Sequence, residues 1–319
     1  MHIITGAAGF IGSNIANKLY DLGHEIILCD HLDHKIKKNN INRLSSVKLI
    51  KPVQLFNFII QNKNKIESVI HMGAISSTAE KNLELLINNN LIFSKKLFNM
   101  CNNLSIKLIY ASSAATYGSG ENGFNDVNNL MNFIKLNPIN FYGLSKHLFD
   151  LQILEAINAN DNASRSVGLK FFNVYGPNEL HKGFMMSPIP KFLKQIRETK
   201  ELNLFKSHHP NFAHGEQCRD FIYVKDCVDV VLWLLKKKSV TGILNVGTGK
   251  KNTFINLARI IFKNENLKEK IKFISTPIEI RDGYQYMTKA NISLLREKGY
   301  KKNFTTLYNG VNDYINNYL

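Results

Sequence analysis

The chain has 319 residues, of which 44% are hydrophobic, so it is long enough for one large domain or two modest ones with a packed core. It has no apolar run of 18 residues and no basic segment followed by an apolar stretch at its start, so we expect neither a membrane span nor a secretory signal. Four scattered cysteines without a CxxC pair, and a net charge of +16 spread along the chain, argue against disulfides, a metal site and a nucleic-acid partner, and favour the cytoplasm.

Short apolar runs alternate with longer amphipathic segments along the first half of the chain. Strands are expected at His2–Thr5, Glu25–Cys29, Ser68–His71, Lys107–Ala111 and Ser166–Phe171, with helices at Gly12–Leu22, Leu83–Cys101 and Phe141–Ala159. This βαβ rhythm predicts an α/β fold with a Rossmann-type doubly wound parallel sheet. We place the sheet domain at 1–170, with returning segments near 219–248, and a smaller α/β C-terminal lobe mainly at 171–319.

Three glycines, Gly6, Gly9 and Gly12, lie between the first strand and the first helix. They permit a tight turn, close approach of a pyrophosphate to the backbone, and packing of the helix on the strand, so the first domain is expected to bind a dinucleotide. Asp30 ends the second strand 18 residues after Gly12, the place of a ribose-binding carboxylate. Asp30 favours NAD, but nearby basic residues could neutralise the 2′-phosphate of NADP, and both cofactors stay open: His31, Lys35, Lys37 and Lys38.

A catalytic group is predicted from a strand-end serine and a YxxxK pair. Ser113 ends the strand that begins at Lys107, where open α/β sheets bind their ligands. Tyr142 and Lys146 are four residues apart, so they share one face of the expected helix. A lysine ammonium beside a phenol favours the phenolate, which suits a general base.

Together these features resemble the extended short-chain dehydrogenase/reductase superfamily. Longer segments resemble the ADP-L-glycero-D-manno-heptose 6-epimerase family within it, over nearly the full length: 73–80, 110–118, 172–183, 219–221, 245–249 and 283–285. The most discriminating segment ends in His181-Lys182-Gly183, because other sugar epimerases share the preceding Asn-Val-Tyr-Gly-Pro but usually not that ending.

The resemblance implies epimerisation at C-6 of an ADP-heptose, from the D-glycero to the L-glycero form, by transient oxidation with bound NADP, with NAD possible. Such a product supplies the lipopolysaccharide core. Tyr142 and Lys182 would be the two acid/base groups. Lys146 would hold the nicotinamide ribose and lower the pKa of Tyr142, and Ser113 would orient the reacting oxygen. Spacing alone would make Lys182 a phosphate anchor or a surface lysine.

The same correspondence assigns two sets of binding residues and implies a homo-oligomer. The dinucleotide set is Gly6, Gly9, Phe10, Ile11, Gly12, Asp30, His31, Lys37, Met72, Gly73, Ala74, Ile75, Ser76, Asn89, Tyr142, Lys146, Val174 and Lys182. The ADP-sugar set is Ser76, Ser113, Asn173, Phe184, Lys191, Phe205, Lys206, Ser207, His208, Arg219 and Tyr284. The Arg219 guanidinium suits a pyrophosphate, although an ion pair with Asp220 or Asp226 is an alternative.

Departures from the family pattern bear on the substrate. Phe184 stands where many relatives have a small residue, Asp282-Gly283 replaces Gly-Arg, and region 46–54 lacks the expected aspartates. Another nucleotide-sugar epimerase or dehydratase is therefore an alternative, although Ala114-Ala115 after Ser113 lacks the acidic pair of a dehydratase. A non-catalytic dinucleotide sensor is a second alternative, which the intact YxxxK pair disfavours.

Overall fold

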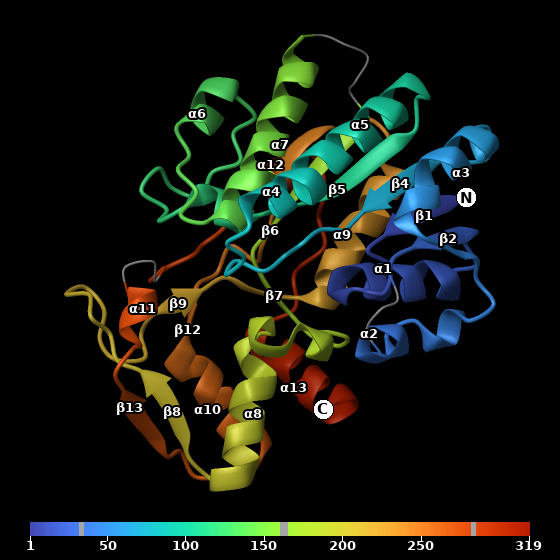
Figure 1. Ribbon diagram of the computed structural model, residues 1–319. Helices are drawn as coiled ribbons and strands as arrows, with labels where there is room; N and C mark the ends of the chain where they lie inside the picture. The colour runs from blue at the N-terminus through green and yellow to red at the C-terminus, as the bar shows by residue number, and fades with distance from the viewer. Residues whose placement is uncertain (32–34, 160–164, 282–284) are drawn as a thin grey trace.

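The computed structural model describes residues 1–31, 35–159, 165–281 and 285–319. Its centre is a sheet of seven parallel strands in the order β11-β6-β5-β4-β1-β2-β3 (Figure 1), which confirms the predicted α/β fold with a Rossmann-type doubly wound sheet. The strands are β1 (His2–Thr5), β2 (Ile26–Cys29), β3 (Leu49–Ile50), β4 (Ser68–His71), β5 (Lys107–Ser113), β6 (Ser166–Phe171) and β11 (Gly242–Val246).

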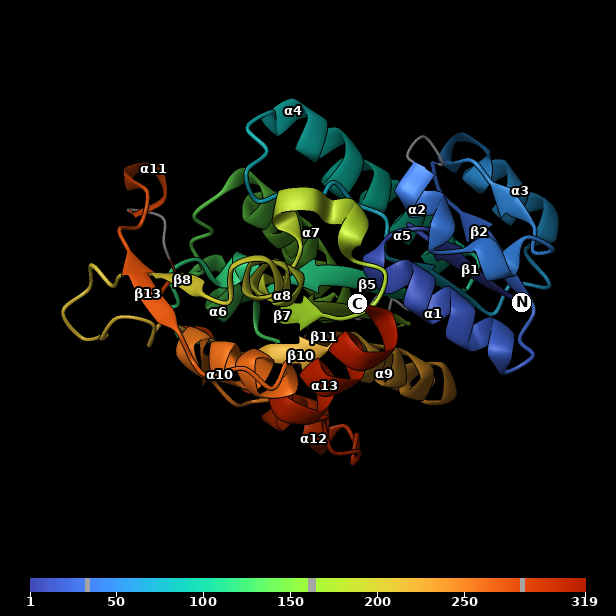
Figure 2. The same cartoon turned by 90° about the horizontal axis from the view of Figure 1, so that it is seen from below.

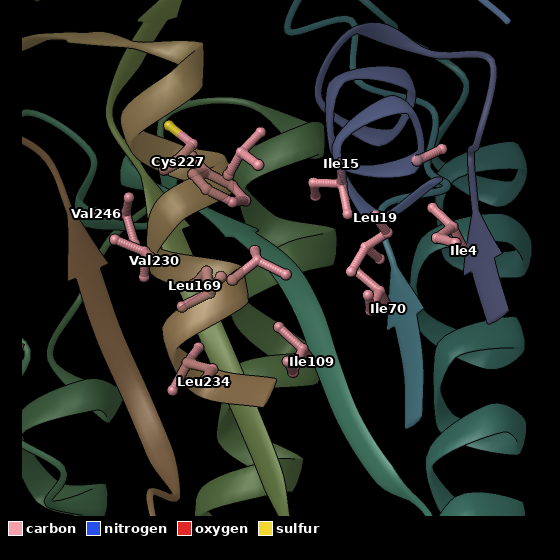
Figure 3. Packing of buried hydrophobic residues seen from close by; sticks show 14 of the residues in the cluster. Ile4, Ile15, Leu19, Ile70, Ile109, Leu169, Cys227, Val230, Leu234 and Val246 are labelled. Carbon is pink, nitrogen blue, oxygen red and sulfur yellow. The ribbon is translucent and has the colours of Figure 1, made fainter. Parts of the chain in front are cut away.

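Helices cover both faces of this sheet, which is why its strands are apolar on both sides. One face is covered by α1 (Phe10–Asp21) and α9 (Val224–Lys236), and the other by α3 (Leu55–Asn62), α5 (Phe93–Asn103) and α7 (Phe141–Asn158). Figure 3 shows the first interface, where side chains of the sheet meet those of α1 and α9: Ile4, Ile70, Ile109, Leu169, Ile15, Leu19, Val230 and Leu234. Truncating such a buried leucine costs about 2–5 kcal/mol.

The strand order reverses between β1 and β4, and this switch point positions the site. From β1 the chain proceeds to β2 and β3 on one side, and to β4, β5, β6 and β11 on the other. The segments after β1 and β4 therefore meet in a crevice at the carboxyl ends of the strands. Their contact is so close that a Cβ on Gly6 would lie 2.6 Å from the backbone nitrogen of Gly73.

The second lobe is built from short strand pairs and three helices, seen from below in Figure 2. The pairs are β7 (Asn173–Tyr175) with β10 (Phe221–Tyr223), β8 (Leu202–Phe205) with β13 (Ile271–Ile274), and β9 (Cys218–Arg219) with β12 (Asn252–Thr253). The helices α8 (Pro188–Thr199), α10 (Phe254–Asn264) and α13 (Leu307–Tyr318) enclose a core of their own. Between these pieces, β11 returns to the central sheet beside β6.

The remaining elements are short: α2 (Lys35–Asn39), η1 (Asn42–Leu44), η2 (Pro52–Gln54), α4 (Leu83–Leu86), η3 (Ile87–Ile92), η4 (Ala114–Tyr117), α6 (Leu130–Ile134), η5 (Leu180–Met185), α11 (Ile278–Arg281) and α12 (Ser293–Glu297). The single helix expected at Leu83–Cys101 is α4 and α5 joined by a π-helical turn. Within the described ranges, no helix has the length and apolarity to cross a membrane, no cluster of three metal-ligating side chains occurs, and the four cysteines are free and buried.

Candidate active site

A cavity of about 780 Å³ lies at the carboxyl ends of the central strands, between the two lobes. Every residue assigned to the dinucleotide lines it, and so do the four expected catalytic residues, Ser113, Tyr142, Lys146 and Lys182. Residues that are far apart in the sequence therefore share one space, as the strand-end argument requires.

The glycine turn leaves the end of α1 open for an anion. Gly6 has φ +64°, and a Cβ on Gly12 would lie 2.1 Å from the carbonyl oxygen of Gly6, so neither position accepts a side chain. Helix α1 begins at Phe10 with no side chain capping its N–H groups and no acidic residue in its first turn. Free N–H groups and the helix dipole therefore fit a dinucleotide pyrophosphate.

Asp30 lies where the ribose of such a dinucleotide is expected. Its buried carboxylate accepts hydrogen bonds from the backbone nitrogens of Ala8 at 2.8 Å and His31 at 2.6 Å, and it pairs with the ammonium of Lys37. The lysine thus offsets the carboxylate charge that would repel a 2′-phosphate.

Tyr142 and Ser113 are brought together by the start of α7. Asn140 caps this helix by accepting from the Gly143 nitrogen at 2.8 Å, and Gly143 packs so tightly that a Cβ there would lie 2.7 Å from the Ala115 oxygen. Tyr142 then hydrogen-bonds to Ser113. This confirms neither role by itself, but it places a phenol and a hydroxyl where one substrate oxygen can contact both.

Lys146 is expected to lower the pKa of Tyr142, but in this structure the pKa of Tyr142 is raised. Burial raises the pKa of Tyr142, the hydrogen bond with Ser113 opposes this, and the charge of Asp150 adds to the rise. Burial also lowers the pKa of Lys146 to about 8, against the charge of Asp150. For both groups burial is the largest cause, because both side chains are removed from water.

Lys182 comes from a different lobe and reaches the cavity from η5. Its ammonium lies 5.6 Å from the ring centroid of Phe10, directly beside the glycine turn. Burial lowers the pKa of Lys182 and the charge of Lys191 adds to this, whereas Glu179 opposes it. A lysine that is less basic than usual suits acid/base exchange.

Asparagines fasten this segment to the nucleotide lobe. The Asn40 amide donates to the oxygens of Ala8 at 2.9 Å and Asn178 at 3.1 Å, and contacts Nδ1 of His181 at 3.2 Å. Asn14 donates to the oxygen of Pro177 at 2.9 Å. The glycine turn and the segment leading to Lys182 are therefore held together across the lobes.

A sequence profile of the NAD dependent epimerase/dehydratase family matches residues 2–247. The chain belongs to this family. It is 42% identical to the ADP-L-glycero-D-manno-heptose-6-epimerase of Nitratidesulfovibrio vulgaris strain Hildenborough and 43% identical to that of Fusobacterium nucleatum, over 100% of this chain and 98% of each relative. The solved structure of the Helicobacter pylori ADP-L-glycero-D-manno-heptose-6-epimerase has 27% identity and a TM-score of 0.79, covering 98% of this chain and 94% of that one.

Other members of the epimerase/dehydratase family share the architecture. A UDP-N-acetylglucosamine 4-epimerase from Methanobrevibacter ruminantium M1, solved with UDP-N-acetylmuramic acid, has 26% identity and a TM-score of 0.82, covering 98% of this chain and 96% of that one. The fold is thus shared with a structure named for a different reaction, and the fold alone does not decide the substrate.

Only part of the expected substrate set lines the cavity of this family member. Ser76, Ser113, Asn173 and Arg219 do so, and the Arg219 guanidinium lies 5.6 Å from the centroid of the Phe254 ring. Tyr284 lies outside the described residues. The remaining members of the set do not line the cavity: Phe184, Lys191, Phe205, Lys206, Ser207 and His208. The Phe184 side chain is 73% exposed, so it does not crowd the cavity here.

Several residues that support the site were missed from the sequence. His71, which is buried in the cavity wall, contacts the hydroxyls of Thr5 at 2.6 Å and Ser94 at 3.0 Å. Asn90 holds both backbone groups of Ile75 at 2.9 Å. In the sequence, each of these residues is only a polar side chain within an apolar segment. That pattern predicts little, because the residues that bind the side chain lie far away along the chain.

A buried ion pair was also missed. Lys170 of β6 and Asp150 of α7 are both 0% exposed and lie 2.6 Å apart. The Asp150 carboxylate also accepts from the hydroxyls of Tyr110 at 2.9 Å and Ser112 at 2.7 Å. Asp150 follows Tyr142 and Lys146 at helical intervals of four, so the pair lies directly behind the YxxxK residues.

Proposed function

We propose that this protein epimerises C-6 of an ADP-heptose, converting ADP-D-glycero- to ADP-L-glycero-D-manno-heptose for lipopolysaccharide core synthesis. The observation that carries the proposal is that Tyr142 and Lys182, from different lobes, share one cavity with a dinucleotide cradle. The names of relatives at 42–43% identity over the full chain support the same reaction.

Two acid/base groups explain how one site serves both epimers. The dinucleotide cradle would hold a nicotinamide cofactor, which would supply reversible hydride transfer at C-6. Tyr142, hydrogen-bonded to Ser113, exchanges the proton of the C-6 oxygen in one orientation, and Lys182 does so in the other. Lys146 is proposed to hold the ribose, and its ammonium to offset the effect of burial on the phenolate of Tyr142 once the cofactor and substrate are bound. Arg219 is proposed to bind the pyrophosphate.

We propose NADP as the cofactor, with NAD as the alternative. The Lys37–Asp30 pair supports NADP, because the lysine supplies a positive charge at the edge of the ribose site. Denaturing the purified protein and identifying the released nucleotide by mass spectrometry tests this. Recovery of NAD alone would mean that Asp30 decides the preference.

The function is tested by incubating the purified holoenzyme with ADP-D-glycero-D-manno-heptose and following the configuration at C-6 by NMR. We expect interconversion that needs no added reductant or oxidant. A second candidate, a 4-epimerase acting on UDP-sugars, is favoured by the structural likeness to the Methanobrevibacter enzyme. The same assay with UDP-N-acetylglucosamine distinguishes the two, and turnover of neither sugar would leave a dinucleotide sensor. The homo-oligomeric state and cytoplasmic location stay predictions.

A further inference from the structure

A glutamate is completely buried at the base of the loop that carries Lys182. Glu179 lies three residues before Lys182 and is 0% exposed. A carboxylate removed from water costs several kcal/mol unless hydrogen bonds and cations compensate it, so its partners indicate what it does.

Three donors reach the Glu179 carboxylate, and they come from both ends of the loop. The nitrogen of Gly176, just after β7, donates to Oε1 at 3.1 Å. The nitrogen of Ser187, the N-cap residue of α8, donates to Oε2 at 2.5 Å, and its hydroxyl donates to Oε1 at 2.7 Å. Glu179 therefore joins the end of β7 to the start of α8 and closes the base of loop 177–186.

The tip of this loop is loosely packed by comparison. Gly183 has φ +55°, with open space where a Cβ would lie, and the neighbouring Phe184 side chain is largely exposed. Lys191 holds the tip by donating to the Phe184 oxygen at 2.6 Å. The position of Lys182 thus depends on how firmly the base of the loop is fixed.

The carboxylate also supplies charge. Backbone N–H groups donate to both of its oxygens and oppose the effect of burial, which is larger and raises the pKa of Glu179. The groups that face it are Lys182 of η5, Lys191 of α8 and Tyr314 of α13. Its charge raises the pKa of both lysines against the effect of burial, and together with burial it raises the pKa of Tyr314.

We propose that Glu179 is a positioning residue for Lys182, which closes the base of the Lys182 loop and places a fixed negative charge beside the lysine ammonium. This inference rests on the proposed role of Lys182 as the second acid/base group. In that role Lys182 must carry a proton in one half of the cycle, and the charge of Glu179 favours the protonated lysine by opposing the effect of burial on its pKa.

The test uses Glu179→Gln, which keeps the size of the side chain but removes the charge and replaces one acceptor by an amide NH₂. In the purified holoenzyme, the pKa of Lys182 is measured by trace acetylation with acetic anhydride across neutral to alkaline pH, with labelled peptides quantified by mass spectrometry. We expect Lys182 to become reactive at lower pH in the variant, and kcat for epimerisation to fall by about 10-fold or more with little change in KM. Glu198→Gln, on the exposed side of α8, is the matched control and leaves both unchanged.

Ser187→Ala tests the closure of the loop separately from the charge of Glu179. It is also the variant to use if Glu179→Gln does not fold. It removes one donor and keeps the carboxylate, so we expect faster amide hydrogen exchange in residues 177–187 and a lower kcat. An unchanged Lys182 profile in folded Glu179→Gln, or unchanged exchange in Ser187→Ala, overturns the inference. If the Lys182 profile shifts while epimerase activity stays full, the effect of Glu179 on Lys182 is supported. The same result overturns the proposed role of Lys182 as an acid/base group.

Discussion

Replacing Asp150 by Asn should destabilise the protein strongly, because it removes the hydrogen-bonded counter-charge of the Lys170 ammonium and leaves only the more weakly coupled Asp126. Both side chains are 0% exposed, so water cannot replace the lost partner. Breaking such a pair from one side costs about 3–5 kcal/mol. Lys170→Met should cost less, since the remaining Asp150 still accepts from Tyr110 and Ser112. Removing both charges in Asp150→Asn/Lys170→Met should restore most of the stability, because a buried pair replaced by neutral groups is often close to neutral overall.

Urea unfolding of the four proteins measures these terms as a double-mutant cycle. With a slope of about 3 kcal/mol per M, the midpoint for Asp150→Asn should fall by roughly 1 M or more. The control is Asp21→Asn, which breaks an exposed pair with Arg43 and should change the free energy of unfolding by about 0.5 kcal/mol or less. A loss below about 1 kcal/mol for Asp150→Asn, or a double variant as unstable as the sum of the single ones, would refute the reasoning.

Three further predictions concern activity. Tyr142→Phe should keep the fold and the bound dinucleotide while turnover falls by about 10²–10⁴, and steady-state rates within a few-fold of the parent would remove Tyr142 from the chemistry. Lys182→Met should stop net epimerisation, although it should still dismutate an aldehyde analogue of the substrate slowly. The double variant with Tyr142→Phe should dismutate this analogue almost as fast as either single variant. Epimerisation at near parental rate by Lys182→Met would return Lys182 to a phosphate-binding role. Because the pKa of Lys146 lies at about 8 and its ammonium is the useful form, activity should fall as pH rises through that value, and a rate that is flat from pH 7 upward would contradict this.

The positions of the central strands were predictable because each is a short apolar run buried on both faces. The glycine turn, Ser113 and the YxxxK pair were visible for a similar reason, since their spacing is local and their chemistry is specific. The two-residue strand β3 gave no such signal. Glu179 and Lys170 looked like ordinary charged residues, because their burial depends on partners in other elements, up to 54 residues away for Lys170. The substrate set was the weakest part: Phe205–His208 were placed by resemblance alone, and the structure puts them outside the cavity wall.

The hydrogen bonds from Asn40 to Ala8 and Asn178 join the glycine turn to the segment that leads to Lys182, and we expect them to slow the loss of a bound dinucleotide. An epimerase of this kind returns its oxidant to the starting state in every cycle, so loss of the nucleotide midway would strand a reactive ketone. These hydrogen bonds hold the segment that carries Lys182 against the glycine turn, so this edge of the cavity opens only when they break. We therefore expect the bound nucleotide to leave slowly, so that its residence time rather than its affinity protects the intermediate.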